Sequence, residues 1–148
     1  MKTENQNFRY IEWKSPEEMH FSSLQWNSEL KFIRDEHKFL EDMLREYTLP
    51  IIESHLLDKT KDLISRLTDS EKKEEALLKE GTKHANALEI MVDGIDQPGE
   101  EKKYREDHRK LLNEINAYTR DYRMLKKEIF QTISAVLKQQ KQKRLLKP

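Results

Sequence analysis

The chain contains no cysteine and has three glycines and four prolines among its 148 residues. Without cysteine it cannot form a disulfide, a thiolate zinc site, an iron–sulfur cluster or a cysteine nucleophile. The few glycines argue against a sheet-based enzyme, which needs glycine-rich turns at many places. No stretch approaches the ~18 apolar residues of a membrane-spanning helix. These absences favour a helical protein outside the membrane.

Charge of one sign is not in excess either. The 28 basic and 28 acidic residues balance, although charged residues make up 38 % of the chain. A neutral chain has no general attraction to nucleic acid, so we expect no nucleic-acid partner and no stable membrane association. Residues 1–10 lack the apolar run of a signal peptide, and we therefore expect a cytoplasmic location.

What the sequence does contain is a long helical rhythm. Apolar residues recur every three to four positions, the spacing of one face of an α-helix, and predict helices over about 16–48, 57–93 and 99–142. Ser15 to Glu18 forms a helix start, because serine caps the helix, proline suits its first position and glutamate closes the capping box. Leu49-Pro50 interrupts the rhythm, so a connection is predicted from residue 49 to the second helix.

Short connections between these segments predict that neighbouring helices run in opposite directions. The expected fold class is all-α, an elongated antiparallel three-helix bundle that resembles a coiled coil. We expect one domain over residues 1–148, with a polar and aromatic extension over 1–14 and a basic tail over 143–148.

The clearest turn follows the second predicted helix. Residues Leu88 to Pro98 read LEIMVDGIDQP, in which Gly94 suits the end of a helix. This segment is similar to one in small helical proteins of flavobacteria, and the similarity extends weakly along most of the chain. The resemblance implies a helical bundle and no particular activity.

The two turns also set a register between the helices, accurate to about one helical turn. It places His20, His84 and His108 within about one turn of each other, and three converging imidazoles are a candidate metal site. The alternative is that each histidine is a half-buried polar residue bonded to a neighbouring group. We expect no cofactor, and metal or small-ligand binding by this histidine layer is the second hypothesis.

The same register predicts two further layers. Trp26 is expected beside Gly81, so that the missing side chain makes room for the indole. His37 is expected near Ser70 and Tyr122 as a polar layer. The charged run from Glu71 to Glu75 is interpreted as a solvated helix face, with Glu74 as its one inward residue.

Three apolar residues, Phe32, Phe39 and Met43, widen the apolar stripe of the first helix and predict contact with a second chain. No phosphate-binding glycine loop, nucleophile elbow or HExxH helix is found. The leading hypothesis is therefore a non-enzymatic structural or interaction protein, a homodimer or the partner of another helical protein. The basic residues of 138–148 suit the end of a helix dipole, and binding of a polyanion or a membrane surface by this segment is the third hypothesis.

Overall fold

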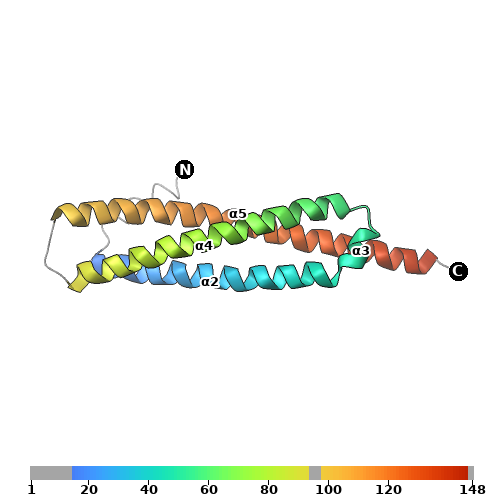
Figure 1. Ribbon diagram of the computed structural model, residues 1–148, viewed down its shortest axis with the longest axis horizontal. Coiled ribbons are helices and arrows are strands. Elements are labelled where there is room, and N and C mark those ends of the chain that lie inside the picture. The colour runs from blue at the N-terminus through green and yellow to red at the C-terminus, as the bar shows by residue number, and fades with distance from the viewer. Residues whose placement is uncertain (1–14, 94–97, 147–148) are drawn as a thin grey trace. The chain divides into compact units, whose positions relative to one another are not determined.

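The computed structural model describes residues 15–93 and 98–146, and this part of the chain is helical without any strand (Figure 1). Four helices follow one another, and they are α2 (Pro16–Glu46), α3 (Thr48–Ile52), α4 (Leu57–Asp93) and α5 (Pro98–Leu146). The predicted all-α class is confirmed. None of the described helices is long and apolar enough to cross a membrane.

Helix α2 begins as the sequence predicts. The Ser15 hydroxyl accepts a hydrogen bond from the backbone N–H of Glu18 at 3.2 Å and donates one to Glu18 Oε1, also at 3.2 Å. The first N–H groups of a helix have no partner within the helix, and this cap satisfies one of them. Glu17 and Glu18 also place negative charge at the positive end of the helix dipole.

The predicted connection from residue 49 is wrong in its first part. Helix α2 ends at Glu46, and the five-residue helix α3 follows it over Thr48–Ile52 (Figure 1). Pro50 is tolerated because it lies in the first turn of α3, where a helix makes no use of the backbone N–H that proline lacks. Ile51 anchors this short helix, since its side chain is buried.

Helix α4 has the predicted bounds, Leu57–Asp93. Helix α5 begins at Pro98 and continues to Leu146, four residues beyond the predicted end, so residues 143–146 of the predicted basic tail are helical. The predicted extension over 1–14, the turn at 94–97 and residues 147–148 lie outside the described residues.

The chain divides into two compact units, each drawn from more than one helix. Unit 1 consists of Met1–Phe32 and Glu74–Tyr118, and unit 2 of Ile33–Lys73 and Thr119–Pro148. The single domain predicted over 1–148 stays a prediction.

Each unit has an apolar core to which its helices contribute. The buried apolar residues of unit 1 come from α2, α4 and α5 and include Met19, Trp26, Leu30, Leu77, Leu88, Leu111, Ile115 and Tyr118. Those of unit 2 come from all four helices and include Ile33, Leu40, Leu44, Ile51, Leu63, Leu67, Tyr122, Leu125, Ile129 and Val136. Burial of these side chains is the main stabilising contribution in each unit.

Candidate functional site

Three aromatic side chains from three helices meet in unit 1, and we call them the ring cluster: Trp26 of α2, His84 of α4 and His108 of α5. The Nε2 atom of His84 lies 2.9 Å from Nδ1 of His108, within hydrogen-bond distance. The Trp26 ring is tilted against that of His108 with centroids 4.6 Å apart, and its centroid lies 6.2 Å from that of His84. Tyr104 extends the cluster, with its ring centroid 5.6 Å from that of His84.

The hydrogen bond between the two histidines restricts their protonation. One ring nitrogen must donate and the other must accept, so a proton on both nitrogens would break the bond. Burial lowers the pKa of His84, and the negative charge of Asp107 partly opposes this shift. His108 has no exposed surface. The two facing nitrogens therefore share one proton. His84 is uncharged at neutral pH.

The glycine of α4 faces a different residue from the one predicted. A Cβ atom added to Gly81 would collide with Oδ1 of Asn27 and lie 3.2 Å from its Cγ, whereas Trp26 packs on the histidines instead. The expectation that Gly81 makes room for the Trp26 indole is wrong. Adjacent helical residues point about 100° apart, and a register accurate to one turn does not distinguish them. The Asn27 carboxamide therefore occupies the space beside Gly81 that a side chain would fill.

Three buried polar atoms of α2 lie in this part of unit 1 and find no hydrogen-bond partner among the described residues. They are Nδ1 of His20, Nε1 of Trp26 and Oδ1 of Asn27. A buried donor or acceptor without a partner costs about 1–3 kcal/mol, so each such atom in a folded protein needs an explanation. A small molecule or water that pairs with one of these atoms would recover this cost. The ring cluster, which includes Trp26, is therefore the strongest candidate for a ligand site.

The structure brings together two of the three histidines predicted to form a layer. His84 and His108 are in contact, and the α2 residue beside both of them is Trp26. His20 precedes Trp26 by six residues, which is about 9 Å along a helix axis. Within the described residues, no group of three or more His, Cys, Asp or Glu side chains is arranged to hold a metal ion.

Unit 2 contains the second predicted layer, and it is confirmed. The Nε2 atom of His37 hydrogen bonds with Ser70 Oγ at 2.9 Å, and the His37 ring meets the edge of the Tyr122 ring at a centroid distance of 5.1 Å. Burial lowers the pKa of His37, and the negative charges of Glu41 and Glu36 partly oppose this shift. The layer joins α2, α4 and α5 within unit 2.

A carboxylate links Tyr122 to a lysine beside this layer. The Tyr122 hydroxyl donates to Glu36 Oε1 at 3.1 Å, and Lys126 Nζ donates to Glu36 Oε2 at 3.0 Å. The phenol, the carboxylate and the ammonium group therefore satisfy one another between α2 and α5.

Two carboxyl groups from α2 and α4, those of Glu41 and Glu71, also meet in unit 2. Burial, a hydrogen bond with Glu41 and the negative charge of Glu41 together raise the pKa of Glu71 from 4.5 to about 7. The interpretation of the Glu71 to Glu75 run as a solvated face is therefore wrong for Glu71, whereas Glu74 is buried as predicted. The sequence gives no signal for the Glu41–Glu71 pair beyond their placement near the His37 layer.

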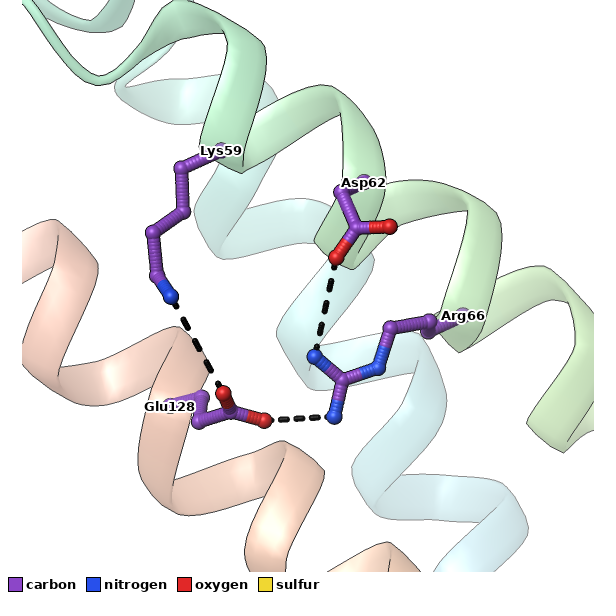
Figure 2. A network of polar contacts seen from close by, with 4 residues as sticks. All are labelled: Lys59, Asp62, Arg66 and Glu128. Carbon is purple, nitrogen blue, oxygen red and sulfur yellow. Dashed lines mark hydrogen bonds and ion pairs between the residues drawn. The ribbon is translucent and has the colours of Figure 1, made fainter.

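Figure 2 shows a third polar group of unit 2, which joins α4 to α5. Arg66 is hydrogen bonded to Glu128 and lies 3.7 Å from Asp62, while Lys59 Nζ lies 3.9 Å from the other oxygen of Glu128. The hydrogen bond from Arg66 and the positive charges of Arg66 and Lys59 lower the pKa of Glu128. These side chains are partly exposed, so solvent screens each pair and the group adds little to the stability of the fold.

The predicted interaction residues differ in exposure. Phe32 is 63 % exposed and Phe39 58 % exposed, while Met43 is half-buried. Phe21 of the same helix is also largely exposed. A phenylalanine buries 150–250 Å² when it is fully covered, so α2 presents a considerable apolar area to the solvent.

Comparisons of the chain with models of protein families, with curated proteins and with solved structures find no match. The resemblance of the Leu88 to Pro98 segment to flavobacterial helical proteins stays a prediction.

Proposed function

We propose that this chain is a non-enzymatic, cytoplasmic interaction protein whose long helices form an antiparallel three-helix bundle and whose α2 binds a second copy. The observation that carries the proposal is the exposure of Phe32 and Phe39. Phe21 and Phe32 belong to unit 1 and are eleven residues, about three helical turns, apart, so the helical period aligns them on one side of α2 within that unit. Phe39 is the exposed phenylalanine of α2 in unit 2.

Single exposed apolar residues are common on monomers and need no partner. A row of aromatic side chains is different, because their burial stabilises an interface by about 25 cal/mol for each Å² covered. Aromatic residues are also enriched in the cores of protein interfaces. A two-fold dimer is the simplest closed assembly that covers the same face on both copies.

Sedimentation velocity over a hundredfold range of protein concentration tests this proposal. We expect the wild type to form a dimer and the Phe32→Ser/Phe39→Ser variant to be a monomer of unchanged helix content. The matched control is Ile90→Ser/Met124→Ser, which removes two exposed apolar side chains from α4 and α5. A wild type that stays monomeric, or a control that dissociates equally, contradicts the proposal.

A second candidate function is binding of a metal ion or a small polar ligand at the ring cluster. The contact between His84 and His108 favours it, together with the buried atoms of Trp26 and Asn27 that find no partner. Calorimetric titration with Zn²⁺ at pH 7.5 tests the metal form. Binding near one ion per chain that is lost in His84→Ala and kept in His55→Ala supports it, since His55 is an exposed histidine outside the cluster. Equal binding by both variants contradicts it.

A further inference from the structure

The C-terminal turns of α5 are hydrogen bonded to the connection between α3 and α4 within unit 2. Lys143 Nζ donates a hydrogen bond to the backbone carbonyl of Glu53 at 2.7 Å, and the backbone N–H of His55 donates to Gln139 Oε1 at 3.4 Å. These bonds place Gln139 and Lys143 of α5 beside the residues that follow α3 in unit 2.

Helix α3 and the end of α5 each carry aliphatic side chains that face the solvent. We call them the apolar tip, and each of them is at least 55 % exposed: Leu49, Ile52, Leu145 and Leu146. The first two belong to α3 and the last two to the final turn of α5. None of the four is aromatic, in contrast to the exposed residues of α2.

The end of α5 also carries positive charge. Its exposed cations, the basic run, are Lys138, Lys141, Lys143 and Arg144. Residues 129–148 contain no acidic residue, although the whole chain has as many acidic as basic residues. Positive charge is therefore concentrated at one end of α5, and Glu53, which follows α3, is an acidic residue beside it.

We propose that the apolar tip and the basic run dock this end of unit 2 reversibly on an anionic lipid bilayer. Aliphatic side chains insert at the boundary between headgroups and acyl chains, and neighbouring cations attract the anionic headgroups. A nucleic acid fits this surface less well, because unpaired bases stack on aromatic rings and the apolar tip has none.

The strength expected of this docking is modest. Each cation near an anionic surface contributes about fivefold to the partition coefficient. Charges at a surface are screened within a Debye length of about 8 Å at physiological salt, so the binding is reversible by salt. Such docking is compatible with the expected lack of stable membrane association, which requires a spanning helix or two lipid anchors.

Co-sedimentation of the full chain with vesicles tests the proposal. We compare vesicles of phosphatidylcholine alone with vesicles containing about 30 % phosphatidylglycerol, at low and high salt. The charge variant is Lys138→Gln/Lys141→Gln/Arg144→Gln, which leaves the Lys143–Glu53 hydrogen bond in place. Its matched control is Lys102→Gln/Lys103→Gln/Lys110→Gln, which removes the same charge from exposed positions of α5 in unit 1. The tip variant is Leu145→Gln/Leu146→Gln.

We expect binding to the anionic vesicles alone, weakened about 100-fold in the charge variant and about tenfold in the tip variant. The control is expected to bind within about threefold of the wild type. No binding at low salt, equal binding to neutral vesicles, or equal weakening in the control overturns the proposal. Vesicle binding unchanged in the tip variant, with heparin bound equally well, identifies a general polyanion contact and also overturns it.

Discussion

Units 1 and 2 both contain parts of α2, α4 and α5 around an apolar core, and unit 2 contains α3 as well. They differ in how many buried polar atoms of α2 find a hydrogen-bond partner. In unit 2, His37 hydrogen bonds with Ser70, and the Tyr122 hydroxyl is satisfied by Glu36 and Lys126. Glu71 Oε1 is a buried atom of unit 2 that finds no partner among the described residues, whereas in unit 1 three such atoms belong to His20, Trp26 and Asn27 of α2. Satisfied networks specify and stabilise a fold, whereas each unsatisfied group carries a cost. Helix α2 therefore carries more of this cost in unit 1 than in unit 2.

The largest effect is expected at Gly81 in unit 1. Gly81→Ala collides with Asn27, and this overpacking should lower the free energy of unfolding by about 2 kcal/mol despite the higher helix propensity of alanine. In an Asn27→Ala background the collision is gone, and the same change should stabilise by about 1 kcal/mol. Urea denaturation of the four proteins measures this reversal of sign. Equal effects of Gly81→Ala in both backgrounds would show that Asn27 does not fill the glycine position.

An intermediate effect is expected at Glu71 in unit 2. Its pKa is 4.5 in the unfolded chain and about 7 in the folded one, so the folded protein holds an extra proton between these values. Stability therefore falls as the pH rises from 4.5 through 7 and stays low above it. At pH 8 we expect Glu71→Gln to be more stable than the wild type by about 1 kcal/mol, since solvent screens this half-exposed group. At pH 4.5 the two should be alike.

The control for this measurement is Glu75→Gln, an exposed residue one turn along α4. Thermal unfolding at several pH values gives the three profiles. Parallel profiles for the wild type and Glu71→Gln would contradict a shared proton between Glu41 and Glu71.

The smallest effect compares the histidines of the two units. Asp107 raises the pKa of His84 against the effect of burial, whereas the corresponding charges near His37 are Glu41 and Glu36. Asp107→Asn should therefore lower the pKa of His84 further and leave the pKa of His37 unchanged. Titration of the imidazole signals by NMR at low salt measures both. Equal shifts at the two histidines would mean that the charge acts on the whole molecule and not on the ring cluster.

The sequence predicts those parts of the fold that depend on helical periodicity. The bounds of α4 and the cap at Ser15 are recovered because apolar spacing and capping chemistry are local. The His37–Ser70–Tyr122 layer is recovered too, since its residues lie on the core face of each helix and a register accurate to one turn is sufficient.

The features missed by the sequence depend on finer information. The sequence does not predict α3, because the proline in the first turn of this short helix resembles a helix breaker. The sequence does not predict the contact of Asn27 with Gly81, because the neighbouring Trp26 is the larger apolar residue. The predicted register does not separate adjacent positions. The partial burial of Glu71 follows from the approach of α2 to α4, which no local charge pattern encodes.

The contact between Gly81 and Asn27 also restricts how this sequence can change over time. Position 81 accepts a larger side chain more easily after position 27 has become smaller, because in the opposite order the Asn27 carboxamide must first move aside. Substitution at position 27 is open from the start, since the Oδ1 atom of Asn27 has no partner among the described residues to lose. Mutational paths through this pair therefore have a direction, and relatives that descend along them should carry a small residue at 27 whenever 81 is no longer glycine.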